Sequence, residues 1–145
     1  MEGFSYSSAN PSGRQCVCPA GWHLPSDAEW DQLAQFISSQ KGPYEKISVG
    51  DVNGGWFWKD VGKHLKSKTG WNENGNGTDD FGFNGLPSGA RWYTEVFDQL
   101  GMYGRWWSTT IGNMPYSWSL PYNSNNLNQS ICSPYHAISV RCVRD

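Results

Sequence analysis

The 145-residue sequence has no long apolar run and little net charge. No stretch approaches the roughly 20 apolar residues that a membrane-spanning helix needs, so we expect no membrane span. Met1 is followed by Glu-Gly-Phe-Ser rather than by an apolar segment, so we expect no signal peptide here. The net charge is −2 with both signs well mixed, and the absence of a basic stretch argues against nucleic acid as a partner.

The patterns that mark common catalytic sites are also missing. No nucleophile-elbow pattern surrounds any serine or cysteine, and Gly85 and Gly89 lack the lysine that follows in a phosphate-binding loop. Histidines are few. His23 lies in a Gly-Trp-His-Leu-Pro turn, where we expect a structural hydrogen bond to a carbonyl, and His64 is expected to pack or to lie at the surface. We therefore expect no enzyme activity and no catalytic residue.

Tryptophan and glycine, by contrast, are abundant, with nine and 17 copies. This composition indicates an irregular backbone held by large aromatic anchors. The length fits a single domain over residues 1–145, in which residues 1–15 form a polar N-terminal segment. The cysteines at positions 16, 18, 132 and 142 are even in number and allow three full pairings, which favours an oxidising compartment.

A helix is predicted from Asp27 to near Ser39. Ser26 and Glu29 have the spacing of a capping box, and Lys41-Gly42-Pro43 supplies a stop. Apolar residues then recur at helical spacing and define one face: Trp30, Leu33, Ala34, Phe36 and Ile37. A second short helix is expected from about Asp60 to Ser67.

Short strands are expected in the second half of the chain. They lie near residues 105–108, 116–122, 127–131 and 138–143, with one more near Phe4–Ser7 and a long irregular region over 67–91. Within 116–122, Tyr116, Trp118, Leu120 and Tyr122 alternate with Ser117, Ser119 and Pro121, which predicts a half-buried strand with the larger residues inward. We also expect Trp22, Trp30, Trp71 and Trp107 to belong to the core.

The 72–80 loop carries the oxygen atoms that calcium prefers. The residues are Asn72, Glu73, Asn74, Asn76, Asp79 and Asp80. Their spacing does not fit an EF-hand, and the same side chains are typical of Asx-turns. We therefore expect no metal and no other cofactor, with calcium in this loop as the alternative.

Several motifs together resemble one known family. They are Cys-Pro-Ala-Gly-Trp-His-Leu-Pro-Ser-Asp-Ala-Glu-Trp at 18–30, Gly-Trp-Asn at 70–72, Gly-Thr-Asp-Asp-Phe-Gly-Phe at 77–83, Trp-Trp-Ser-Thr-Thr at 106–110 and Ser-Val-Arg-Cys-Val-Arg-Asp at 139–145. Over residues 16–145 the chain is similar to the Fibrobacter succinogenes major paralogous domain, a family similar to C-type-lectin-like folds. That family usually has a longer leader, so the chain resembles a shortened member or an excised piece of one.

The resemblance implies an α+β fold of the C-type-lectin-like kind, in which two helices flank a small twisted antiparallel sheet with long irregular loops. It also implies a disulfide between Cys18 and Cys142. Cys16 and Cys132 then either form a second bridge or remain free thiols. The Glu-Pro-Asn and Trp-Asn-Asp signatures of sugar-binding C-type lectins are missing.

Residues 106–136 combine the alternation of a sheet with chemically varied outward positions. This mixture resembles the ligand-facing surface of retroelement-diversified variable proteins of bacteria and phages. We therefore expect non-catalytic recognition of a protein or glycan at a bacterial cell surface, in the extracellular space or on a phage virion. The expected ligand-binding residues are Ile111, Asn113, Met114, Ser119, Pro121, Asn128, Ser130, Ile131, Tyr135 and His136.

Three other functions stay open at this point. The alternatives are a structural module of a larger surface protein, a glycan-binding lectin-like domain, and an enzyme resembling those that generate formylglycine. The enzyme alternative is the weakest of the three, because nothing in the sequence suggests the dedicated pocket with reactive cysteines that it needs.

Overall fold

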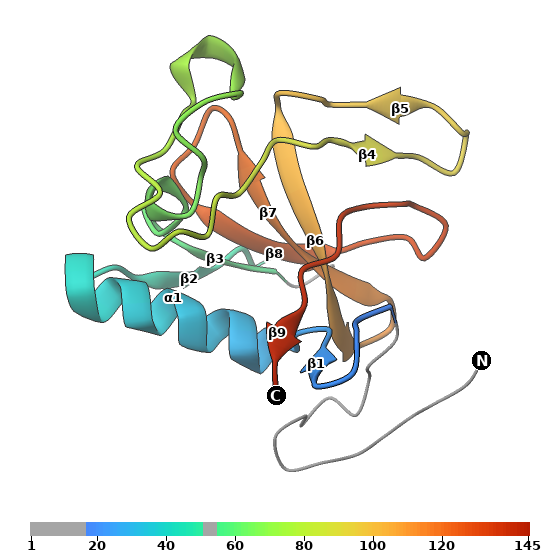
Figure 1. The fold of residues 1–145 in the computed structure, drawn as a ribbon, viewed down its shortest axis with the longest axis horizontal. Coiled ribbons are helices and arrows are strands. Elements are labelled where there is room, and N and C mark those ends of the chain that lie inside the picture. Colours follow the sequence, from blue (N-terminus) through green and yellow to red (C-terminus); the bar gives the residue numbers. More distant parts are fainter. Residues whose placement is uncertain (1–16, 51–54) are drawn as a thin grey trace.

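The computed structural model describes residues 17–50 and 55–145, and its main element is a five-stranded antiparallel sheet (Figure 1). In spatial order its strands are β2 (Lys46–Ser48), β3 (Trp56–Trp58), β8 (Leu127–Ile131), β7 (Pro115–Pro121) and β6 (Tyr103–Ile111). Two short antiparallel pairs accompany it: β1 (Trp22–His23) with β9 (Val143–Arg144), and β4 (Ala90–Arg91) with β5 (Phe97–Asp98). The strand predicted near Phe4–Ser7 lies outside the described residues.

One helix, α1 (Asp27–Lys41), packs on one face of this sheet. The predicted capping box is present, since the Glu29 amide donates to the Ser26 hydroxyl and the Ser26 amide donates to the Glu29 carboxylate. The helix continues to Lys41, slightly beyond the predicted end, and stops where Gly42 and Pro43 follow. No helix in residues 17–50 and 55–145 has the length and apolar character needed to span a membrane.

The expectation of two helices flanking a small sheet is wrong. In the described part of the chain α1 is the only α-helix, and the protein is mostly β with a five-stranded sheet. The stretch predicted as a helix from Asp60 to Ser67 holds only one 3-10 turn, η1 (Gly62–His64). The carbonyl groups that would continue this helix accept hydrogen bonds from a later loop instead, from the amides of Thr78, Asp80 and Gly85. A second 3-10 turn, η2 (Asn72–Asn74), lies within that loop.

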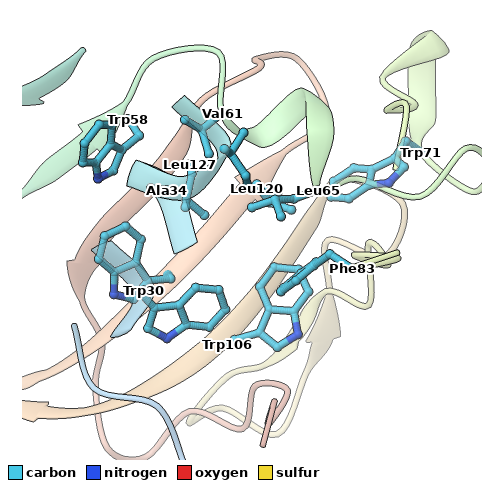
Figure 2. Close-up of a cluster of buried hydrophobic side chains, with 12 residues drawn as sticks. Trp30, Ala34, Trp58, Val61, Leu65, Trp71, Phe83, Trp106, Leu120 and Leu127 are labelled. Atoms are coloured by element: carbon cyan, nitrogen blue, oxygen red, sulfur yellow. The ribbon is translucent and has the colours of Figure 1, made fainter. Parts of the chain in front are cut away.

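The core lies between α1 and the sheet (Figure 2). The Trp30 ring of α1 stacks on Trp118 of β7, with 5.9 Å between the ring centroids. Trp30 and Trp71 are buried as predicted, and Trp107 is half-buried. The prediction for Trp22 is wrong, because neighbouring residues of a strand face opposite sides and the buried position of β1 belongs to His23.

Both faces of strand β7, which lies between β8 and β6, are shielded from solvent. Trp118 and Leu120 face the core as the alternation predicted, but Ser117 and Ser119 are also buried. Ser119 lies opposite Arg105 in the β6–β7 register, so the long Arg105 side chain shares its face of the sheet. The expectation that the smaller residues of this strand face solvent is therefore wrong.

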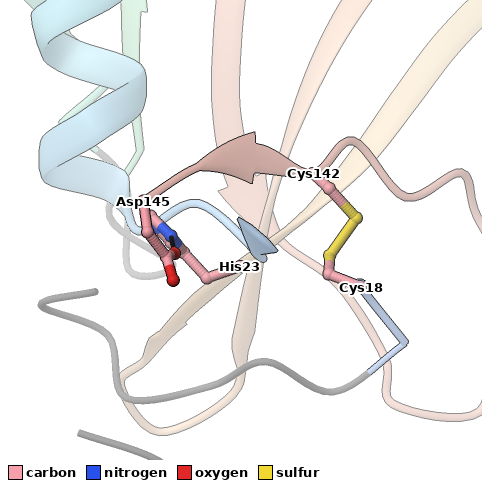
Figure 3. The surroundings of a disulfide bond; sticks show 4 residues. All are labelled: Cys18, His23, Cys142 and Asp145. Carbon is pink, nitrogen blue, oxygen red and sulfur yellow. Dashed lines mark hydrogen bonds and ion pairs between the residues drawn. A yellow bond between two sulfur atoms is a disulfide. The ribbon is translucent and has the colours of Figure 1, made fainter. Parts of the chain in front are cut away.

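The two ends of the described chain are joined by a disulfide between Cys18 and Cys142, which confirms the pairing implied by the family resemblance (Figure 3). Next to it, His23 of β1 pairs with Val143 of β9. Cys132 is a buried free thiol, and burial raises its pKa. Cys16 lies outside the described residues.

Candidate functional site

The ten residues predicted to bind a ligand do not form one continuous surface. Ile111 and Asn113 are exposed at the turn between β6 and β7, and Met114 is half-buried beside them. Ser119 and Pro121 are buried within β7 and offer little side-chain surface to a partner.

The other predicted residues divide between the two faces of β8 and the loop that follows it. Asn128 and Ser130 are half-buried on the face opposite α1, whereas Ile131 is half-buried on the α1 side. Tyr135 and His136 lie in the loop after β8, and Tyr135 is 78% exposed. Among these ten, Tyr135 therefore presents the largest exposed aromatic ring.

The loop after β8 is joined to the β4–β5 hairpin. The His136 ring meets the edge of the Trp92 ring at 4.6 Å and stacks on Tyr93 at 6.1 Å between centroids. Ala137 pairs with Arg91 through two backbone hydrogen bonds of 2.8 and 2.9 Å. The loop and the hairpin thus form one connected surface.

Arg105 of β6 supports this surface from beneath. Its guanidinium lies 4.4 Å from the centre of the Tyr103 ring and 5.7 Å from that of Trp92, and it donates a hydrogen bond of 3.2 Å to the Gln99 side chain. Burial lowers its pKa. Among the described residues Arg105 has no ion-pair partner, so its charge is held by aromatic faces and one amide.

The β4–β5 hairpin carries large apolar side chains that point into solvent. We define the hairpin surface as Tyr93, Val96, Phe97, Leu100 and Tyr135, all of which are exposed. Phe97 is 80% exposed, and together with Leu100 it lines an open groove of about 430 Å³. A side chain at Gly89 would collide with the Asp98 carbonyl, and Gly89 has a positive φ of 69°, so glycine is needed at the base of the hairpin.

Sequence reasoning missed the hairpin surface. Residues 92–100 have neither helical nor strand periodicity, so the stretch gave no signal as an element. A usable signal was present nonetheless: several large apolar residues lie between Gly89 and Gly101 without any spacing that would bury them on one face.

His23 is held by two carboxylates rather than by the predicted carbonyl. Nε2 lies 2.6 Å from Glu29 Oε1. On the other side of the ring, Nδ1 lies 2.6 Å from Asp145 Oδ1 (Figure 3). Burial lowers the pKa of His23, but these hydrogen bonds outweigh it and the net pKa is raised. Burial raises the pKa of Glu29, and its bonds from Ser26 and His23 reverse this to a net decrease. Both ring nitrogens of His23 are therefore engaged with carboxylates of the chain.

His64 is a packed core histidine, one of the two roles expected for it. Its ring is buried between the Tyr44 hydroxyl, 2.8 Å from Nε2, and Asp80 Oδ2, 2.7 Å from Nδ1. The hydrogen bond from His64, together with Lys41 at 3.3 Å, lowers the pKa of Asp80. This group ties the end of α1 to the 72–80 loop.

Three of the six side chains considered as calcium ligands in the 72–80 loop accept hydrogen bonds from the protein itself, those of Asn76, Asp79 and Asp80. Asp79 accepts from the Asn84 amide at 2.7 Å and Asn76 accepts from the Trp71 amide at 3.1 Å. Glu73 and Asn74 are exposed. Residues 17–50 and 55–145 contain no group of three or more His, Cys, Asp or Glu side chains arranged to hold a metal ion.

A buried lysine lies beneath this loop, and sequence reasoning missed it. The Lys66 ammonium donates to the carbonyl oxygens of Ser124 at 2.7 Å, Gly75 at 3.1 Å and Tyr122 at 3.4 Å. It also lies 5.0 Å from the centre of the Trp71 ring. Burial lowers the pKa of Lys66 to about 8. Lys66 therefore serves as a cation built into the chain, joining the 72–77 loop to residues 122–124.

Over the residues that the structure describes, these features define a tryptophan-rich β domain closed by a disulfide, with exposed aromatic side chains on the hairpin surface. The model of the Fibrobacter succinogenes major domain matches residues 1–144, and the chain belongs to this family. No curated protein and no solved structure matches the chain.

Proposed function

We propose that this domain is a non-catalytic recognition module that binds a protein or glycan at a bacterial cell or phage surface. The observation that carries the proposal is the hairpin surface. Phe97, Leu100 and Tyr135 each leave more than three quarters of their surface in solvent. Clustered exposed apolar side chains mark interaction sites, and aromatic rings supply much of the affinity in protein and glycan recognition.

The hairpin surface is anchored in a way that suits binding. Arg105 and Gln99 hold Trp92 and Tyr103 from below, and Ala137 ties the neighbouring loop to Arg91. Side chains on an ordered backbone lose less conformational entropy when a partner binds. The anchoring therefore supports recognition by a preformed surface.

The disulfide supports a location outside the reducing cytoplasm. Cys18 and Cys142 are bridged, and such bonds persist in oxidising compartments such as the periplasm or the cell exterior. This agrees with a role at a cell or virion surface.

The proposal is tested by screening the domain on a glycan array and against surface-displayed proteins, and then measuring affinity for any ligand found. Phe97→Ser combined with Leu100→Ser should lower the affinity for that ligand at least tenfold, as loss of central apolar anchors does. Ile111→Ser at the exposed β6–β7 turn is the matched control and should change the affinity little.

Each outcome of the screen points to one function. Loss of binding in Ile111→Ser alone would indicate that the ligand binds the predicted 106–136 face instead of the hairpin surface. Failure to find any ligand in either screen would favour a structural module of a larger surface protein. Equal effects of both variants would contradict a site confined to the hairpin surface.

A further inference from the structure

A second concave site lies between α1 and β9, and it shares no residue with the hairpin surface. It is a groove of about 360 Å³. Its walls are mainly apolar and include Trp22, Leu33, Phe83 and Val143. Residue Trp22 is 40% exposed, although a side chain of this size at the edge of a core is usually covered. The size lies at the lower end of the range for small-molecule sites.

The charged residues of the groove are unequal in their pairing. Glu29 lines the groove, but its carboxylate accepts hydrogen bonds from His23 and Ser26 and is compensated. Arg141 and Arg144 also line the groove and form no ion pair or side-chain hydrogen bond with any residue that the structure describes. Two guanidinium groups therefore remain available to an anion.

Arg141 is also held in place. Its guanidinium lies 4.2 Å from the centre of the Phe83 ring, and the carboxylate of Asp79 acts on it only at longer range. Burial lowers its pKa. The N–H groups of a guanidinium lie in its own plane. A guanidinium over an aromatic ring can therefore still bind a carboxylate with two hydrogen bonds at its edge.

We propose that this groove binds a small carboxylic acid with an apolar body, such as an arylalkanoic acid. Its ring lies against Trp22, Leu33 and Val143, and its carboxylate is bound by Arg141 with Arg144 at the rim. Charge complementarity selects the anion, and the apolar walls select against a hydrophilic acid such as acetate. The site goes beyond the proposed recognition function, since it concerns a different ligand on a different surface.

The test is a titration of the full 145-residue chain with 3-phenylpropanoate, followed by the indole N–H signals of the tryptophans in nitrogen-15 NMR spectra. The signals of Trp22 and Trp30 should shift with saturation, whereas that of Trp92 on the hairpin should not. The neutral 3-phenylpropanamide should bind about tenfold more weakly, because hydrogen bonds to a charged group are the stronger kind.

Variants locate the carboxylate. Arg141→Met keeps the packing on Phe83 but removes the charge, and it should lower the affinity for 3-phenylpropanoate about tenfold. Arg91→Met, which removes a hairpin arginine outside the groove, is the matched control and should leave the affinity unchanged. Should Arg141→Met fail to fold, the comparison of acid with amide on the unaltered protein still decides the question.

Three results would overturn the proposal. They are no shift at Trp22 or Trp30, equal binding of acid and amide, and unchanged affinity in a folded Arg141→Met variant. A fourth arm uses a short peptide ending in a free phenylalanine carboxylate. Binding of that peptide without binding of 3-phenylpropanoate would show that the groove takes a peptide terminus rather than a free acid.

Discussion

The α1-facing core and the hairpin surface are both rich in aromatic residues, yet they differ completely in burial. Trp30 is 2% exposed and touches the rings of Phe83, Trp106 and Trp118. Phe97 is 80% exposed and has no ring contact within the described residues. The difference arises because α1 covers one face of the main sheet, whereas the β4–β5 pair forms a separate small sheet (Figure 1). Residue type alone therefore does not say whether an aromatic side chain holds the fold or contacts a partner.

The largest expected effect is a loss of stability when the aromatic core under α1 is truncated. Trp30→Ala should lower the free energy of unfolding by about 3–5 kcal/mol, because it leaves a cavity among three aromatic rings. Denaturant unfolding monitored by circular dichroism measures this loss. Trp22→Ala, at an exposed position, is the control and should cost less than about 1 kcal/mol. Similar losses in both variants would show that burial does not separate the two tryptophans.

The second prediction extends the comparison to a buried charge. Lys66→Met should destabilise the protein by about 2 kcal/mol, because three carbonyl oxygens lose a charged donor. Amide hydrogen exchange should increase in residues 72–77 and 122–126 before it increases in β6–β8. Lys63→Met, an exposed neighbour, is the matched control. Unchanged exchange in the 72–77 loop of Lys66→Met would contradict the role of Lys66 as a built-in cation.

The third prediction concerns the pH dependence of the chain closure at His23. The raised pKa of His23 contributes stability that is complete below its unfolded value of 6.5 and is lost as the pH rises through the folded value. The lowered pKa of Glu29 contributes stability that is complete above its unfolded value of 4.5 and is lost as the pH falls through the folded value. The stability difference between wild type and His23→Gln should therefore be largest between pH 4.5 and 6.5, at about 1–2 kcal/mol.

Urea unfolding of both proteins from pH 4 to 8 measures this difference. A difference that does not change with pH would mean that the ring contributes by packing alone. Glu29→Gln should remove most of the pH dependence on the acidic side while leaving the disulfide intact.

The smallest expected effect is the change in stability when an exposed ring of the hairpin surface is truncated. Phe97→Ser should change the free energy of unfolding by no more than about 0.5 kcal/mol, since the ring has little buried area to lose. Thermal unfolding measures the change. A loss comparable to that of Trp30→Ala would show that the Phe97 ring is part of a core, and the hairpin surface would no longer support recognition.

The sequence predicted those elements whose signals are local. The capping box of Ser26 and Glu29 and the apolar spacing from Trp30 to Ile37 are properties of one short segment, and α1 begins where they predict. The alternation around Trp118 likewise predicted a strand, in which Trp118 and Leu120 face inward as expected. The family resemblance correctly supplied the disulfide between Cys18 and Cys142.

The failures concern groups whose partners lie far along the chain. The predicted helix at 60–67 did not form, because its carbonyl groups bind amides of Thr78, Asp80 and Gly85. From its sequence context Lys66 is expected at the surface. In the structure its ammonium donates to the carbonyl groups of Tyr122 and Ser124, more than 50 residues away. The exposure of the hairpin surface likewise depends on which elements cover it, and no local pattern encodes that.

The disulfide also determines how this domain responds to a pulling force. A force that enters the chain before Cys18 and leaves it after Cys142 passes through the sulfur–sulfur bond and bypasses the intervening chain, since the two cysteines are 124 positions apart in the sequence. While the bond is oxidised, tension cannot peel α1 from the sheet or unzip β6 from β7. Reduction places the β1–β9 pair and the core directly in the line of force. The extension of the tethered domain should then increase sharply, so the redox state of one covalent bond sets its mechanical strength.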